Sequence, residues 1–197
     1  MNIEALEVRD ALAEGAQRII AANGYTGLKL EDILREAGLP EDILDETPDM
    51  KSRIIFSLGM RLFEKLQEES LVEGDVIDML DSYLTSSIRI LAGSSIELVQ
   101  VWIEELVNEK HGYGPQKMRW DWESIARIIR AGIEKGQLRE DTPVSRLTGL
   151  LLAQYYGILF AWCVMQGSMN APWAMRFYVT ETFPKLLAPY RIGQAET

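Results

Sequence analysis

The sequence predicts an all-α protein of about nine helices, with a small N-terminal unit in front of a larger helical body. Apolar residues recur at helical spacing along almost the whole chain, and no repeat, low-complexity tract or Pro/Gly/Ser linker interrupts them. Glycines and prolines stand at the ends of these segments, where helices are expected to stop and start. A chain of 197 residues is long enough to bury a sizeable core without disulfides.

Three short helices are expected in the first 48 residues. The first covers residues 8–23 and ends at an Asn-Gly pair, which is typical of a helix C-terminus. The second runs over about residues 30–37 and stops at Gly38, and the third begins at Pro40, since proline fits a first helical turn. The segment Thr47-Pro48-Asp49 then supplies a cap, a proline and an acid for a long fourth helix.

Five longer helices follow, over about residues 75–91, 94–110, 115–134, 142–166 and 171 onward. Ser94-Ser95-Ile96-Glu97 has the pattern of a capping box at the start of the second of these, and Gly136 closes the third. Pro184 lies inside the last helix and is expected to kink or end it, because proline lacks the amide hydrogen that a helix interior needs.

Charge is distributed unevenly along the chain. The net charge is −10, which opposes binding to polyanions, and residues 1–50 hold twelve acids and four bases, a net of −8. Cys163 is the only cysteine, so no intrachain disulfide can form, and the N-terminus lacks the apolar stretch of a secretion signal. We therefore expect a soluble, cytoplasmic protein.

The segment around the expected second helix resembles the helix-turn-helix unit of the TetR (tetracycline repressor) family. Residues 24–25 read Gly-Tyr, and residues 28–39 read Leu-Lys-Leu-Glu-Asp-Ile-Leu-Arg-Glu-Ala-Gly-Leu. Counting on without gaps, Leu44 falls on the leucine of the family's third helix and Lys51 on the lysine that opens its fourth helix. Residues 133–139 resemble a sequence motif that commonly precedes the family's eighth helix. Because the order of nine helices also matches, the resemblance covers the whole chain.

The resemblance implies a transcriptional repressor that acts as a homodimer. Residues 1–48 would form the helix-turn-helix unit, and residues 49–197 would form the ligand-binding and dimerisation domain. In such proteins a small molecule enters the C-terminal domain and shifts the spacing of two DNA-reading units, which relieves repression. No cofactor is implied.

The expected DNA-reading helix departs from the family's pattern. Residues 40–48 read Pro-Glu-Asp-Ile-Leu-Asp-Glu-Thr-Pro, with Asp45 where the family has a phosphate-contacting tyrosine and Pro48 where it has an aromatic anchor. Residues 30–50 hold eight acids against Arg35 alone, although DNA affinity rests largely on basic residues that neutralise phosphates. The nearby basic residues that could contact a DNA backbone are Lys29, Lys51 and Arg53.

Charge therefore disfavours DNA as a partner, and two interpretations stay open. The first is a ligand-responsive TetR-type regulator. The second is a degenerate TetR-fold protein that binds a lipophilic small molecule or a protein partner without binding DNA. An enzyme is a distant third, because the sequence has no nucleophile elbow, phosphate-binding glycine loop or HExxH-type pair, and its only histidine, His111, has no metal-ligand partner of its own kind.

Residues 147–165 form an uncharged stretch of the eighth expected helix, long enough to cross a membrane. Gln154 near its middle favours a buried helix in a helical body over membrane insertion. Small residues recur at every fourth position on one side and allow a second helix to approach closely. By resemblance, the last two helices form the homodimer interface. The small residues assigned to that interface are Gly149, Ala153, Gly157 and Ala161.

The opposite side of this helix is expected to face the interior of its own subunit and, with the preceding helices, to line the ligand pocket of the family. A lining rich in aromatic residues and methionine would suit a lipophilic or aromatic ligand. The alternative for each single residue is ordinary core packing. The predicted lining residues are Met79, Tyr83, Trp102, Leu106, Trp122, Ile125, Ile129, Leu151, Tyr155, Leu159 and Trp162.

Overall fold

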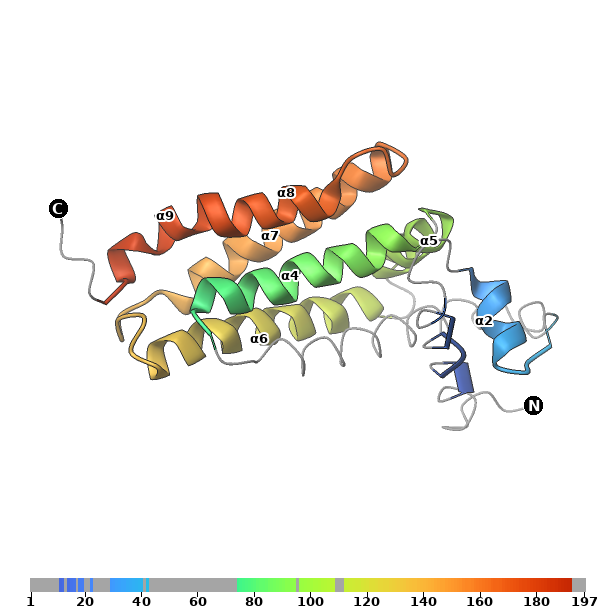
Figure 1. The fold of residues 1–197 in the computed structure, drawn as a ribbon, viewed down its shortest axis with the longest axis horizontal. Coiled ribbons are helices and arrows are strands. Elements are labelled where there is room, and N and C mark those ends of the chain that lie inside the picture. Colours follow the sequence, from blue (N-terminus) through green and yellow to red (C-terminus); the bar gives the residue numbers. More distant parts are fainter. Residues whose placement is uncertain are drawn as a thin grey trace. The chain divides into compact units, whose positions relative to one another are not determined.

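The computed structural model describes residues 11–12, 14–16, 18–19, 22, 29–40, 42, 74–94, 96–108 and 112–192. The elements in these residues are helices, so the predicted all-α class is confirmed (Figure 1). The expected fourth helix and His111 lie outside the described residues.

The chain divides into two compact units. The first unit comprises Met1–Lys65 and Ile90–Lys117, and the second comprises Leu66–Arg89 and Met118–Thr197. The predicted domain boundary between residues 48 and 49 falls outside the described residues and stays a prediction.

In the first unit, α2 (Leu30–Glu36) begins after Lys29 and ends two residues before Gly38, whose φ of 70° suits glycine. The preceding helical segment passes close to the end of α2, because a Cβ added at Gly15 would lie 3.1 Å from the backbone nitrogen of Ala37. Close packing of the two segments therefore depends on a glycine. The first unit also contains α5 (Ile96–Val107).

The second unit is built around two antiparallel helices, α4 (Val76–Gly93) up to Arg89 and α6 (Tyr113–Glu134) from Met118 (Figure 1). The start of α4 lies against the end of α6, where a Cβ added at Gly132 would lie 3.1 Å from the Val76 side chain. Gly136, with a φ of 68°, ends the turn after α6, as predicted.

Two further segments complete the second unit: α7 (Val144–Val164) and a helical run that packs against it (Figure 1). This run consists of α8 (Ala171–Phe177), a π-helical turn (Tyr178–Thr182), α9 (Phe183–Leu187) and a 3₁₀ turn (Ala188–Tyr190). Pro184 does not end the helical run. The π turn lies directly before the first turn of α9, in which proline's missing amide hydrogen is tolerated.

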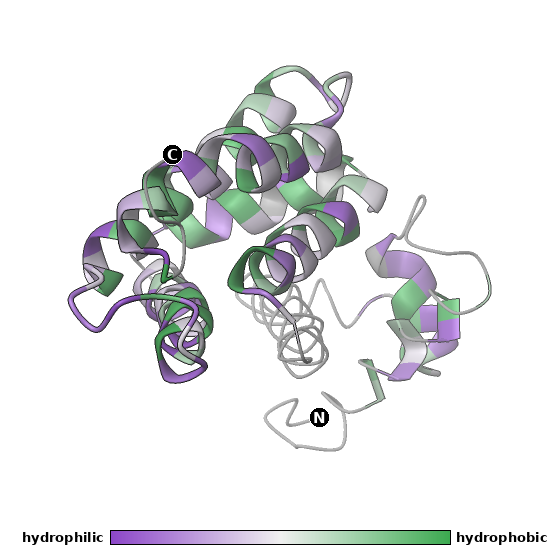
Figure 2. Cartoon of the chain, turned by 60° about the vertical axis from the view of Figure 1, so that its left-hand side comes forward, coloured by the Kyte–Doolittle hydropathy of each residue, from purple (hydrophilic) through white to green (hydrophobic). Residues whose placement is uncertain are grey.

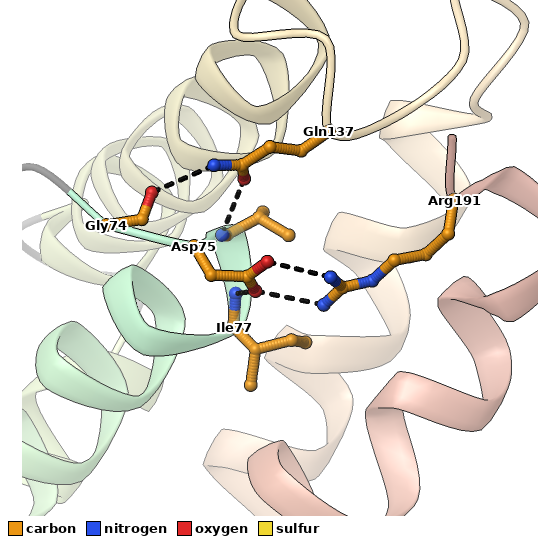
Figure 3. Close-up of polar contacts among 6 residues, drawn as sticks. Gly74, Asp75, Ile77, Gln137 and Arg191 are labelled. Atoms are coloured by element: carbon orange, nitrogen blue, oxygen red, sulfur yellow. Dashed lines mark hydrogen bonds and ion pairs between the residues drawn. The ribbon is translucent and has the colours of Figure 1, made fainter. Parts of the chain in front are cut away.

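A polar cluster links the start of α4 to the turn after α6 and to the C-terminal segment (Figure 3). Gln137, just after α6, accepts a hydrogen bond from the Val76 amide at 2.8 Å and donates one to the Gly74 carbonyl at 3.0 Å. Asp75 forms a bidentate ion pair with Arg191, with nitrogen to oxygen distances of 2.7 and 2.9 Å. Two contacts therefore fix the start of α4, one from the turn after α6 and one from the C-terminal segment.

α7 is long and apolar enough, by length and composition, to cross a membrane, and half of its most apolar stretch is buried inside the protein. The residues that were predicted to point inward, Leu151, Tyr155, Leu159 and Trp162, are all buried. The other side of α7 carries exposed apolar residues, including Phe160, which is 64% exposed. Figure 2 shows that hydrophilic and hydrophobic residues alternate along most of the described helices. A helix that is apolar all round needs a second covering surface.

Candidate ligand-binding site

Asp121 places a carboxylate in the interior of the second unit. It lies on α6 one turn before Ile125 and two turns before Ile128, and both of these residues are buried. Asp121 is therefore on the inward face of the helix, and only 3% of it is exposed. A buried carboxylate is costly unless polar groups surround it.

Two tyrosine hydroxyls from neighbouring helices approach this carboxylate. The hydroxyl of Tyr156, on α7, donates to one oxygen of Asp121 at 2.5 Å, a short distance typical of a bond to a charged acceptor. The hydroxyl of Tyr83, on α4, lies 3.5 Å from the other oxygen, which makes a much weaker bond. Asp121 thus joins α4, α6 and α7 through polar side chains.

The electrostatics of this cluster keep its phenols protonated. Burial, followed by the charge of Asp121, raises the pKa of Tyr83, Tyr155 and Tyr156 above the ordinary value for tyrosine. The rings of Tyr155 and Tyr156 pack edge to face, with centroids 5.1 Å apart. Under ordinary conditions the cluster therefore offers neutral hydroxyl groups beside a carboxylate.

Two other buried hydroxyls on α7 differ from those of Tyr83 and Tyr156. The Oγ1 atom of Thr148 has no hydrogen-bond partner, and the Oη atom of Tyr155 has none within 3.5 Å. Ser87, on α4, donates its own hydroxyl to the Leu84 carbonyl at 2.8 Å, and its interaction with the Tyr155 hydroxyl opposes part of the rise in the pKa of Tyr155. The interior therefore contains hydroxyls that its own packing satisfies poorly.

The predicted lining residues fall into both units. In the second unit, Met79 and Tyr83 lie on α4, Trp122, Ile125 and Ile129 on α6, and Leu151, Tyr155, Leu159 and Trp162 on α7. Trp102 and Leu106 lie on α5 in the first unit. All of them are buried or half-buried, and the Asp121 cluster brings Tyr83 and Tyr155 into one neighbourhood. Their role in ligand binding stays a prediction.

The small residues predicted for the dimer interface do not share one environment. Ala153 and Gly157 are exposed, and Ala161 is partly buried. Gly149 is also partly buried, and a Cβ added there would lie 3.7 Å from the Trp122 ring of the same chain. The exposed part of the stripe is therefore its middle, next to Phe160.

Of the residues predicted to contact DNA, the structure describes only Lys29, which is exposed directly before α2. Lys51 and Arg53 lie outside the described residues, as do Asp45 and most of the expected reading helix. The acidic Asp42 is exposed.

The structure adds polar core residues that the sequence did not single out. Asp121, Tyr156 and Thr148 belong to the second unit, and Lys117, which is fully buried, belongs to the first. The Nζ atom of Lys117 lies 5.7 Å from the centroid of the Trp102 ring. Helical spacing from Ile125 back to Asp121 was the available signal for a buried acid.

No family model and no curated protein matches this sequence. Solved structures match its fold, however. SmeT, the repressor of the Stenotrophomonas maltophilia multidrug efflux pump SmeDEF, superimposes with a TM-score of 0.57 at 19% identity, covering 94% of this chain and 91% of SmeT. Thermus thermophilus FadR, a TetR-family transcriptional repressor solved with lauroyl-CoA, gives 0.54 at 18% identity, covering 96% and 98%.

Reduced NemR of E. coli also matches, with a TM-score of 0.55 at 16% identity over 87% of this chain and 95% of NemR. Identities this low establish the fold alone. Almost the whole length of each chain is aligned, so the similarity is not confined to the helix-turn-helix segment. The chain therefore has the fold of the TetR-type regulators, as the sequence resemblance predicted.

Proposed function

We propose that this chain is a TetR-type transcriptional regulator that responds to a lipophilic small molecule and acts as a cytoplasmic homodimer. The observation that carries the proposal is the interior of the second unit, where the Asp121 cluster and the poorly satisfied hydroxyls of Thr148 and Tyr155 lie in an apolar core. Apolar surroundings with a few polar groups are typical of small-molecule sites. SmeT has been solved with triclosan, an apolar aromatic compound, and FadR with lauroyl-CoA, which carries a long apolar acyl chain.

The exposed side of α7 and α8 supports the homodimer. Phe160 and Val164 on α7 and Trp173 and Phe177 on α8 are all at least half exposed. The rings of Trp173 and Phe177 stack with centroids 5.3 Å apart, so together they form one continuous apolar surface. Large apolar side chains that gather on a surface mark a contact with another molecule, and a second copy matches the interface that the family resemblance implies.

A second candidate function is favoured by charge. The acidic segment of residues 30–50 opposes approach to DNA phosphates, which supports a protein of this fold that binds a lipophilic molecule or a protein partner without binding DNA. Both candidates keep the fold and the dimer. They differ in whether DNA is bound, and the second candidate also allows a protein partner in place of the lipophilic molecule.

Native mass spectrometry of the purified protein tests the shared part of the proposal. We expect the mass of a dimer and, in a fraction of molecules, an additional small lipophilic molecule that organic extraction removes. A panel of aliphatic and aromatic lipophiles should also raise the melting temperature of the stripped protein, because a ligand that binds only the folded state stabilises it. A monomer whose melting temperature no lipophile changes would contradict the proposal.

A further inference from the structure

The last described residues of the second unit lie across the turn that follows α6. Arg139 donates its amide hydrogen to the Tyr190 carbonyl at 2.8 Å, and Ile192 donates its own to the Gln137 carbonyl at 3.1 Å. These two bonds form a short antiparallel bridge between the turn and the C-terminal segment. We call residues 188–192 the C-terminal strap.

The strap and the start of α4 hold each other through a closed ring of contacts, most of which Figure 3 shows. The side chain of Arg191 donates two hydrogen bonds to Asp75, at 2.7 and 2.9 Å. Val76, the next residue along the chain, donates its amide hydrogen to the Gln137 side chain at 2.8 Å. The backbone carbonyl of Gln137 accepts from Ile192, which follows Arg191 and closes the ring. Each contact therefore orders the residues that make the next one.

The strap adds little to the buried core. None of the residues of its 3₁₀ turn is buried, and Ile192 is 55% exposed. By contrast, Phe183 and Leu187, directly before the strap on α9, are fully buried. Segments that are held by few buried apolar contacts open at a lower free energy than the core does. The strap can therefore detach while α9 stays packed.

We propose that the C-terminal strap is a latch, which detaches from the turn after α6 as one cooperative unit and thereby releases the start of α4. Gly74, whose carbonyl accepts a hydrogen bond from Gln137 at 3.0 Å, is the first described residue after the chain has passed from the first unit into the second. The latch links the end of the last helical run to this entry segment. Neither a ligand nor DNA is needed for this behaviour, so it is independent of the proposed function.

Amide hydrogen exchange of the full-length protein tests the latch, followed residue by residue by NMR at a series of low urea concentrations. The amides of Val76, Arg139 and Ile192 should have similar protection factors, at least about tenfold below those of the α7 amides. Their dependence on urea should be shallow, because opening the latch exposes far less surface than global unfolding does. Three different protection factors, or values equal to those of α7, would overturn the latch, since the contacts would then open separately or only when the whole unit unfolds.

Two substitutions test the coupling from opposite sides of the ring. Arg191→Gln removes the ion pair with Asp75 and should lower the protection factor of Val76 about fivefold, although the bond from Val76 to Gln137 is not itself altered. Gln137→Met removes the side-chain bonds to the start of α4 and keeps the backbone carbonyl that accepts from Ile192. Because coupling between two contacts is reciprocal, this variant should lower the protection factor of Ile192 by a similar factor.

Arg130→Gln is the matched control, because it removes an ion pair on the exposed side of α6 and should leave these protection factors unchanged. If either test variant does not fold, the other still decides the coupling. Unchanged protection of Val76 in Arg191→Gln, or of Ile192 in Gln137→Met, would show that the contacts break independently and would overturn the latch.

Discussion

The carboxylate of Asp75 illustrates how one residue can link pH to the stability of the second unit (Figure 3). Burial opposes its ionisation, but hydrogen bonds from Arg191 and the Ile77 amide, together with the guanidinium charge, outweigh burial. The pKa of Asp75 therefore lies below its ordinary value of 3.8. A carboxyl group with a lowered pKa in the folded state stabilises the fold wherever it is ionised.

The first prediction follows from the direction of that pKa shift. The stabilisation is fully present above the unfolded pKa and is lost as pH falls through the lower folded pKa, so the window of loss lies below about pH 4. Arg191→Gln should lower the free energy of unfolding by about 1 kcal/mol at pH 7, since the pair is partly exposed to solvent. Urea unfolding at pH 7 and at successively lower pH measures this difference.

Arg130→Gln is the matched control, because Arg130 pairs with Glu123 at 3.6 Å on an open surface where both side chains are more than half exposed. Its effect should be within about 0.5 kcal/mol at every pH. An Arg191→Gln effect that stays constant into the acid range would show that lost packing, not the ion pair, accounts for the destabilisation.

Single residues also show which parts of the interior the sequence can predict and which it cannot. The predicted inward residues of α7 are buried because their helical spacing determines which face they occupy. Asp121 was missed, because a single acid among polar neighbours on a helix usually faces solvent. Its contacts with Tyr83 and Tyr156 depend on how α4 and α7 pack against α6, and no local pattern specifies that packing.

At the scale of the element, turn and proline signals placed most described helix boundaries within a few residues, although the predicted caps were not seen: α2 and α7 have no side-chain cap at their starts, and the Ser94 hydroxyl donates back to the Ile90 carbonyl. The turn signals around Gly38 and Gly136 placed the ends of α2 and α6 well, since both glycines have the positive φ that such positions require. Pro184 was harder to interpret. The sequence shows that an amide hydrogen is missing there, but whether the chain breaks, kinks or inserts a π turn depends on the packing of the whole segment.

α7 illustrates the same limit in another way. Its sequence is apolar on every side, so composition alone fits a buried helix, a membrane span or a helix at an interface. The structure buries one side and leaves Ala153 and Gly157 exposed on the other, and a Cβ added at Gly157 would meet nothing within 4 Å apart from the adjoining helix backbone. A flat exposed strip on an apolar helix is well suited to a second helix.

The second prediction tests that strip. Gly157→Leu leaves the packing of the single chain intact, because its Cβ points into open space, but it should hold two copies apart. Overpacking costs roughly 1–3 kcal/mol at one site, and a twofold dimer contains the site twice, so the total destabilisation of the dimer is doubled. Sedimentation should therefore show a shift from dimer toward monomer. Glu134→Leu, on the exposed end of α6, is the control and should sediment unchanged. A Gly157→Leu protein that remains fully dimeric would place the interface elsewhere.

At the scale of the whole molecule, fold and charge point in different directions. The fold aligns with TetR-type regulators over nearly their full length, whereas the first 50 residues carry most of the net charge of −10. Fold is set by apolar pattern and turns, but affinity for DNA is set by surface charge, so the two properties can diverge in one chain. Lys29 is exposed before α2, and Asp42 is exposed in the segment that follows it.

The third prediction is that this protein binds random duplex DNA hardly at all at physiological salt. On duplex DNA, each phosphate contact makes the logarithm of the affinity fall by about 0.9 for each unit of the logarithm of the salt concentration. This protein has few lysine and arginine side chains in position to make such contacts. Any residual binding should therefore have a shallow salt dependence. Gel shifts over a salt series measure both quantities, and nanomolar binding at about 150 mM salt, where specific binders typically reach about 10⁻⁸ M or tighter, would indicate an ordinary repressor.

The scaffold around the acidic segment still follows the helix-turn-helix pattern, so its charge is expected to be the obstacle. A variant with Glu41→Ala, Asp42→Lys, Asp45→Tyr and Glu46→Lys replaces the acids by small, basic and aromatic residues and should gain measurable non-specific DNA binding with a steeper salt slope. A control with the same total change in charge, placed on exposed helical and turn positions of the second unit, should gain much less. That control carries Glu134→Lys, Glu140→Lys and Glu181→Lys. Equal gains in both variants would mean that net charge alone drives the binding, whereas no gain in the first variant would mean that the segment does not present a reading helix to DNA.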